Sequence, residues 1–207
     1  MKLLTAVAAT ANPDKLREII LILGDTVKLL PRPVNLCETV EDGQTLLDNA
    51  RLKGTAVSEA TGLAAVADDT GLEIDALAGA PGIYSARFAG ENATYEENIE
   101  QVLAELDGIP GDERTARFRT VALIRWPDTS ELIATGTVEG RISLRPHGDF
   151  GFGYDPIFIP SEGHGETFAE MGEAKHLLSH RGRAFRSLGY ELLGKVFPET
   201  GVEVGGI

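Results

Sequence analysis

The hydrophobic and polar positions of the chain fall into two patterns, one typical of helices and one typical of strands. The helical pattern first appears after "TANPDK", where Asn12 can cap a helix that Gly24 can end. Its apolar positions are Leu16, Ile19, Ile20 and Leu23, with Pro13 in the first turn. The same spacing predicts helices over residues 45–61, 94–106 and 179–197, each opening on a Thr or Ser that can cap it.

Strand patterns occur between these helices. Apolar runs at residues 2–10, 27–31 and 63–67 predict buried strands. Residues 114–126 and 131–144 alternate apolar and polar side chains around the turn "PDTS", which predicts an antiparallel hairpin. Helices and strands therefore mix without regular βαβ repetition. With no internal repeat, linker or low-complexity segment, the pattern predicts one domain over residues 1–207.

Composition narrows the class of protein. Hydrophobic residues make up 43% and charged residues 25% of the 207 residues, as in soluble globular proteins, and no apolar stretch is long enough for a membrane span. The net charge is -13 and no long basic run occurs, which argues against polymeric nucleic acid as a partner. The only cysteine, Cys37, excludes an internal disulfide and favours a cytoplasmic location. The start, "MKLLTAVAATAN", resembles a signal peptide, but its apolar core is short and a strand is the better interpretation.

Two segments could hold a phosphorylated ligand and a metal ion. In "TANPDK", the backbone amides at the start of a helix attract anions, and Lys15 can bind a phosphate. The alternative is an ordinary capped helix with a solvated lysine, which is common. No P-loop motif occurs in the sequence. In "ADDTG", Asp68 and Asp69 end an apolar run, where ligands of α/β sheets usually bind. With the acidic loop of Glu38, Glu41 and Asp42, they offer the oxygen ligands that suit Mg²⁺; the alternative is a pair of exposed acids in a turn.

Two later segments could hold a planar base. "FGFGYDP" interleaves aromatic rings with glycines, so the backbone can approach a ligand that a ring covers, although packing on the core is about as plausible. "AKHLLSHRGRA" brings Lys175, His180 and Arg181 to a helix start, although His180 alone would fit a capping or packing role. Taken together, the four segments describe a site for a nucleoside triphosphate with Mg²⁺.

These segments carry a family resemblance. "TANPDK", "ADDTGLEIDALAGAPGIYSARFAG", "FGYDPIF" and "SHRGRA" closely resemble the Ham1-like non-canonical purine nucleoside triphosphate pyrophosphatases, or inosine triphosphate pyrophosphatases, over essentially the whole chain. The resemblance implies a Mg²⁺-dependent homodimer that hydrolyses ITP, dITP and XTP to the monophosphate and pyrophosphate, and so cleanses the nucleotide pool. It also implies an α/β fold with an elongated mixed central sheet flanked by helices and a cleft between two lobes.

The resemblance also implies roles for individual residues. Asp69 matches the catalytic proton acceptor and a metal carboxylate, and Lys15 would offset charge on the leaving pyrophosphate. Glu41 is the best match to the second metal carboxylate, but Val40 departs from the family's paired glutamates and Glu38 remains an alternative. The substrate-binding residues implied are Thr10, Ala11, Asn12, Pro13, Asp14, Lys15, Thr70, Phe152, Gly153, Tyr154, Asp155, Lys175, His180 and Arg181.

The sequence leaves several assignments open. Asp68 would ligate the metal through water or fix the turn. Donors from Lys175, His180, Arg181 or the backbone would recognise a 6-keto oxygen and exclude adenine. The alternative functions are a pyrophosphatase of another base preference and a nucleotide-binding sensor without catalysis.

Overall fold

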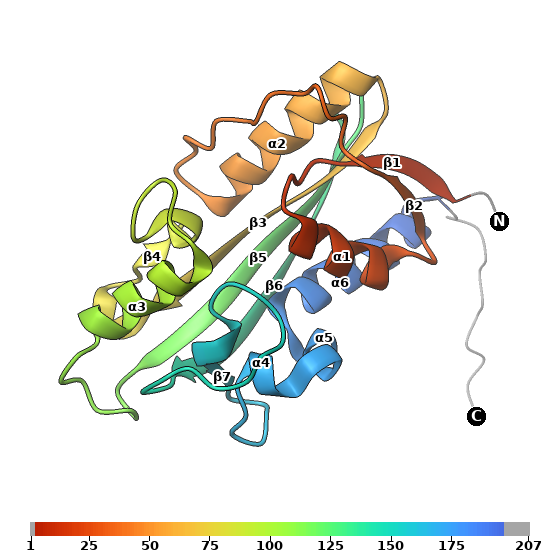
Figure 1. The fold of residues 1–207 in the computed structure, drawn as a ribbon. Helices are drawn as coiled ribbons and strands as arrows, with labels where there is room; N and C mark the ends of the chain where they lie inside the picture. Colours follow the sequence, from red (N-terminus) through yellow and green to blue (C-terminus); the bar gives the residue numbers. More distant parts are fainter. Residues whose placement is uncertain (1–2, 197–207) are drawn as a thin grey trace, which may run out of the picture.

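One long mixed sheet organises residues 3–196, the part of the chain that the computed structural model describes (Figure 1). Its strands are β1 (Leu4–Ala8), β2 (Val27–Leu30), β3 (Ala64–Ile74), β4 (Pro81–Gly82), β5 (Thr115–Arg125), β6 (Glu131–Ile142) and β7 (Phe158–Pro160). The order is β2-β1-β3-β5-β6-β7, with β4 paired to β3. β1 pairs in parallel with β2 and β3, and the remaining pairs are antiparallel. The predicted mixed sheet and the β5–β6 hairpin are confirmed.

The four long helices begin where the sequence places their caps. The helices are α1 (Pro13–Leu23), α2 (Leu46–Thr61), α3 (Tyr95–Glu105), α4 (Phe168–Met171), α5 (Lys175–Leu178) and α6 (His180–Val196). The side chains of Asn12 and Thr45 accept backbone hydrogen bonds at α1 and α2, and Thr94 forms a capping box at α3. Ser179 Oγ accepts a hydrogen bond from the amide of Gly182 and so caps α6. Of the predicted ends, Lys2 and Phe197 lie outside the described residues.

β3 is much longer than the sequence predicts. The apolar run of residues 63–67 was expected to end at Asp68 and Asp69, but β3 continues to Ile74. The reason is that β5 pairs with β3 along residues 65–74, so the ladder supports polar positions that a pattern of apolar residues misses. Asp68 and Asp69 therefore lie within a strand, and the interpretation that Asp68 fixes a turn is wrong.

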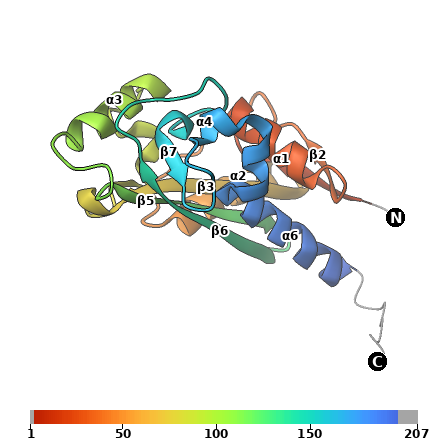
Figure 2. The same cartoon turned by 90° about the horizontal axis from the view of Figure 1, so that it is seen from below.

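The two faces of the sheet carry different helices (Figures 1 and 2). One core cluster joins β3, β5 and β6 to α1 and α6, and another joins β1, β3 and β5 to α2. A third lies toward the α3 end of the long strands and includes Phe118, Phe158 and Phe168. Because successive strand residues face opposite sides, Asp68 faces the side of α1 and α6 and Asp69 the side of α2.

Two details of the helices and strands differ from the prediction. Ile20 was assigned to the buried stripe of α1, but it is 48% exposed, because the helix packs inward through Ile19 and Leu23. α4, α5 and β7 were not predicted, since elements of three or four residues are too short to show a period. Within residues 3–196, no helix combines the length and the apolar character that crossing a membrane requires.

Candidate functional site

The four sequence motifs meet in one cavity, bordered by the loop before α1, by β3, by the start of α3 and by the start of α6. The predicted site residues that line it are Thr10, Ala11, Asn12, Lys15, Glu41, Asp69, Thr70, Phe152, Gly153, Tyr154, Asp155, Lys175, His180 and Arg181. Pro13 and Asp14 do not line it, and their contact with substrate stays a prediction. Glu38 lines the cavity as well.

An acid-lysine corner forms where β3 meets α2. Lys53 Nζ lies 2.8 Å from Asp69 Oδ1 and 3.1 Å from Glu41 Oε2, so one ammonium joins the two predicted metal carboxylates. Burial alone would lower the pKa of Lys53, but the negative charges of Asp69, Asp68 and Glu41 outweigh it and raise the pKa. Asn49 donates to Asp69 Oδ2 at 3.2 Å, which leaves the carboxylate held from two sides.

The loop that carries Glu41 is anchored to this corner. The amide of Gly43 donates to Asn49 Oδ1 at 2.9 Å, and Arg87 Nη2 donates to the carbonyl of Glu41 at 3.1 Å. Glu38 is exposed, and no ion pair holds its side chain within the described residues. Of the two alternatives, Glu41 is therefore the carboxylate that the fold places beside Asp69.

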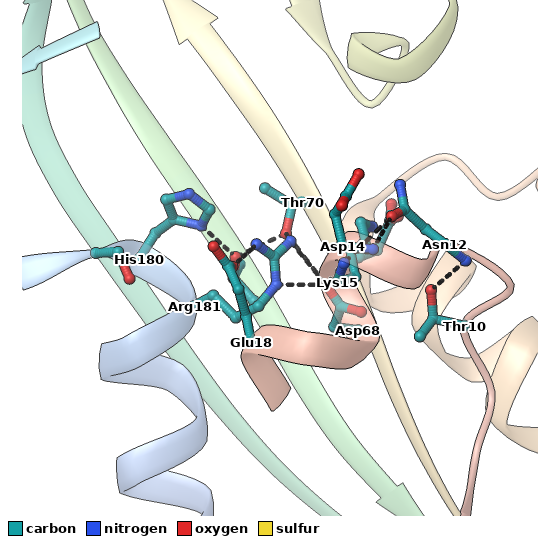
Figure 3. Close-up of polar contacts among 12 residues, drawn as sticks. Thr10, Asn12, Asp14, Lys15, Glu18, Asp68, Thr70, His180 and Arg181 are labelled. Atoms are coloured by element: carbon teal, nitrogen blue, oxygen red, sulfur yellow. Dashed lines mark hydrogen bonds and ion pairs between the residues drawn. The ribbon is translucent and has the colours of Figure 1, made fainter. Parts of the chain in front are cut away.

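The start of α1 supplies positive charge to the neighbouring corner. Asn12 Oδ1 accepts hydrogen bonds from the amides of Asp14 and Lys15 and fixes the first turn. Lys15 Nζ lies 3.5 Å from Asp68 Oδ2 (Figure 3). Burial lowers the pKa of Lys15, and the charge of Asp68 only partly opposes this shift. An anionic ligand reaching this corner would find a partly desolvated ammonium and the amides of a helix start.

Asp68 binds cations on the face of the sheet opposite to Asp69. Arg181 donates to Asp68 Oδ2 through Nε at 3.3 Å and Nη2 at 3.2 Å. Burial alone would raise the pKa of Asp68, but the charges of Lys15 and Arg181 outweigh it and hold the pKa well below its usual range. The adjacent carboxylates therefore do not share one cation: each has its own set of donors.

A chain of buried ion pairs continues from Asp68 to the far side of the cavity (Figure 3). Arg181 Nη1 lies 2.7 Å from Glu18 Oε2, and Lys175 Nζ lies 2.6 Å from Glu18 Oε1 and 2.5 Å from Asp155 Oδ2. Burial alone would raise the pKa of Glu18, but Arg181 and Lys175 outweigh it and lower the pKa. Burial raises the pKa of Asp155, and Lys175 only partly opposes this.

Aromatic rings cover the part of the cavity beyond these charges. Lys175 Nζ lies 5.1 Å from the centre of the Phe152 ring, and the Arg181 guanidinium lies 5.5 Å from it. The Tyr95 ring centre is 5.8 Å from that of Phe152, and its hydroxyl receives a 2.9 Å hydrogen bond from Asn12. Gly153 has φ +60°, a conformation that glycine adopts at little cost. A flat, apolar ligand group would fit beside Phe152, close to the backbone.

His180 lies against the same aromatic wall. Its ring stacks on Phe118 with centres 4.4 Å apart, and its Nδ1 lies 2.7 Å from Thr120 Oγ1. Burial and the nearby charge of Arg181 lower the pKa of His180 well below its usual value, so the ring is neutral at neutral pH. The cavity thus joins a carboxylate corner, a cationic helix start and an aromatic pocket.

The model of the Ham1 family matches residues 6–190, which include all of these motifs. The chain belongs to the Ham1 family. It is 46% identical to a protein of Vibrio parahaemolyticus named dITP/XTP pyrophosphatase, over 88% of this chain and 93% of the relative. It is 44% identical to a protein of the same name from Thermus thermophilus, over 88% of each chain.

Solved structures of the Ham1 family share this fold. A HAM1 protein from Coxiella burnetii superimposes with a TM-score of 0.83 at 39% identity, over 92% of this chain and 98% of that one. A nucleoside-triphosphatase / dITP/XTP pyrophosphatase from Mycobacterium abscessus gives a TM-score of 0.71 at 38% identity, over 89% and 97%. The predicted elongated α/β fold of the family is therefore confirmed.

Sequence reasoning missed several side chains that build the site in this Ham1-family protein. Lys53 lies on the buried face of α2, where a lysine is itself a signal, because a buried ammonium requires acidic partners. Glu18 is 7% exposed and binds both Arg181 and Lys175, yet its only sequence signal is its position one turn after Lys15. Thr120 and Phe118 reach His180 from β5, and no local pattern marks them.

Proposed function

We propose that this protein hydrolyses non-standard purine nucleoside triphosphates, such as ITP, dITP and XTP, to the monophosphate and pyrophosphate. The observation that carries this proposal is that Asp69, Glu41, Lys15 and Phe152 all line one cavity. The names of the relatives from Vibrio and Thermus support the same substrate class.

The carboxylate corner fits Mg²⁺ as the metal of the reaction. Two carboxylates joined by Lys53 face the cavity, and Mg²⁺ in nucleotide enzymes takes one or two carboxylates and completes its shell with water and substrate phosphates. Within residues 3–196, no cluster of three or more His, Cys, Asp or Glu side chains could bind a metal alone, so the substrate would complete the shell. When bound there, Mg²⁺ would neutralise phosphate charge and polarise the reacting phosphoryl group.

The protein's own groups would act on water and on the leaving group. Asp69 would orient the attacking water and accept its proton, while Asn49 and Lys53 hold the carboxylate in place. Lys15 and the amides of α1 would bind the phosphates that leave as pyrophosphate. The buried ion pairs that run from Asp68 to Asp155 would keep Lys15 and the Phe152 pocket at a fixed separation. The site would then bind the base and the phosphates of one substrate at the same time.

The function is tested with a panel of ITP, dITP, XTP, GTP and ATP in Mg²⁺, measuring pyrophosphate and orthophosphate release by the full chain. We expect pyrophosphate as the product, and kcat/KM for ITP and XTP at least about 100-fold above that for ATP, because unpaired buried donors reject the wrong base. Equal kcat/KM for ITP and ATP would contradict the proposed specificity. Binding of ITP without turnover would instead indicate a sensor.

A pair of variants tests the role of Asp69. Asp69→Asn should lower kcat by at least about 100-fold, because the amide cannot accept a proton from water. Asp42→Asn is the matched control, since Asp42 lies in the same acidic loop as Glu41 but does not line the cavity. An Asp69→Asn variant with normal turnover and unchanged Mg²⁺ dependence would refute the assignment.

A cytoplasmic location and a homodimer are part of the same proposal, and the resemblance to the Ham1-like family supports both.

A further inference from the structure

A row of hydroxyl groups connects Arg181 to His180 across two strands. Thr70 of β3 and Thr120 of β5 are directly opposite in the antiparallel register, and their hydroxyl oxygens are 2.7 Å apart. Arg181 Nη2 donates to Thr70 Oγ1 at 3.0 Å, and Thr120 Oγ1 lies 2.7 Å from His180 Nδ1. Three short contacts therefore run from a guanidinium to an imidazole that lines the cavity.

The direction of this row follows from the donors that each group has. Arg181 can only donate, so the Thr70 oxygen accepts at that contact, and its single hydrogen has to go elsewhere. The two available acceptors are Thr120 Oγ1 at 2.7 Å and Asp68 Oδ2 at 3.3 Å. Only the first lies within the usual range of an O–H···O bond, and Asp68 Oδ2 already receives two N–H groups of Arg181. The shorter distance favours Thr70 as the donor to Thr120, which leaves the Thr120 hydrogen for His180 Nδ1.

This direction determines which ring nitrogen of His180 carries the hydrogen. A neutral imidazole has one N–H, and an Nδ1 that accepts from Thr120 leaves that hydrogen on Nε2. Burial lowers the pKa of His180, which keeps the ring neutral. The ring stacks on Phe118, and Nε2 makes no hydrogen bond within the described residues.

We propose that Thr70 and Thr120 are positioning residues that fix His180 as the Nε2–H tautomer, so that the cavity presents a hydrogen-bond donor to the 6-keto oxygen of a purine. The choice of purine substrate rests on the proposed function, whereas the tautomer does not. A 6-amino group would place donor against donor at this atom, which disfavours adenine. The opposite tautomer, with the hydrogen on Nδ1, would present an acceptor and favour adenine instead.

The tautomer is measured directly on the ligand-free full chain. Long-range ¹H–¹⁵N NMR spectra of protein labelled with ¹⁵N-histidine, with His180 assigned through His180→Asn, should show a protonated Nε2 and an unprotonated Nδ1. A wild-type ring that carries its hydrogen on Nδ1 would overturn the proposal. This readout needs no substrate, so it stands even if ITP is not hydrolysed, a result that would refute only the proposed function.

Kinetics with ITP and ATP test the consequence for specificity. Thr120→Val keeps the shape of the side chain but removes the hydroxyl, and the ratio of kcat/KM for ITP over ATP should fall by about 3- to 10-fold, with a mixed tautomer in the NMR spectrum. Thr120→Ser keeps the hydroxyl and should retain the ratio within about twofold. An unchanged ratio in Thr120→Val, or an equal loss in Thr120→Ser, would refute the positioning role.

Discussion

Lys53 shows how one buried ammonium can hold two carboxylates together. It is 7% exposed and has Asp69 and Glu41 as direct partners, so its ammonium stays protonated despite burial. Without it, the two carboxylates would face each other in a partly dry site, which is unfavourable unless another cation replaces it.

We expect Lys53→Met to lower the free energy of unfolding by about 3 kcal/mol, because it leaves buried Asp69 without its cation. Arg51→Met is the control on the same helix, since Arg51 is more exposed and pairs with Glu131 away from the cavity. Its effect should stay below about 1 kcal/mol. Urea titrations of the three proteins measure both values, and similar losses for the two variants would contradict the role of Lys53.

The positions of His180 and Arg181 in the site depend on how α6 packs on β6. Gly136 of β6 is the register partner of Thr120. A Cβ atom at Gly136 would collide with the backbone of His180 and Ala184. The missing side chain therefore lets the first turn of α6 approach β6 closely, which brings His180 to Thr120 and Arg181 to Asp68.

We expect Gly136→Ala to push the start of α6 away from the sheet, at a cost of about 1–3 kcal/mol in unfolding free energy and with a clear loss of kcat/KM for ITP. Gly194→Ala in the same helix is the matched control, because a Cβ there meets open space. That variant should be unchanged or more stable by up to about 1 kcal/mol. Denaturant titration and the pyrophosphate assay test both variants. A Gly136→Ala protein with wild-type activity would show that the close approach is not required.

At the scale of the whole molecule, a chain of buried ion pairs connects elements that are far apart in the sequence. Lys15 and Glu18 come from α1, Asp68 from β3, Lys175 from α5 and Arg181 from α6. The pKa of Asp68 and that of Glu18 lie below their usual values in the folded protein. Carboxylates of this kind stabilise the fold above their ordinary pKa, and the contribution is lost as the pH falls toward the folded-state pKa.

We expect the free energy of unfolding to decrease as the pH falls below about 4, and to decrease less steeply in Asp68→Asn, which has no carboxylate there to protonate. At neutral pH the same variant should be less stable by about 3 kcal/mol, because Arg181 and Lys15 lose their partner. Asp112→Asn, at an exposed loop position, should follow the wild-type curve. Denaturant titrations from pH 7 to pH 3 give the three curves, and parallel curves for wild type and Asp68→Asn would contradict this account.

Local sequence signals predicted the parts of the molecule that local forces determine. The caps at Asn12, Thr45, Thr94 and Ser179 and the alternation of β5 and β6 each depend on neighbouring residues, and all were confirmed. β3 was predicted too short because its polar half is stabilised by pairing with β5, which lies about fifty residues further along the chain. Most of the motif residues line one cavity, although Pro13 and Asp14 do not, and their roles in the reaction stay a prediction.

The sequence by itself determined the starts of the four long helices, the hairpin and the family. It also supplied the residues that we propose for a triphosphate site. The tertiary structure decided how those groups are paired. Asp68 and Asp69 look alike in "VADDTG", but the alternation of β3 turns them to opposite faces, one toward Arg181 and Lys15 and the other toward Lys53. Their partners come from different helices, so no local pattern could assign them, and the pairing follows only from which helix packs on which face of the sheet.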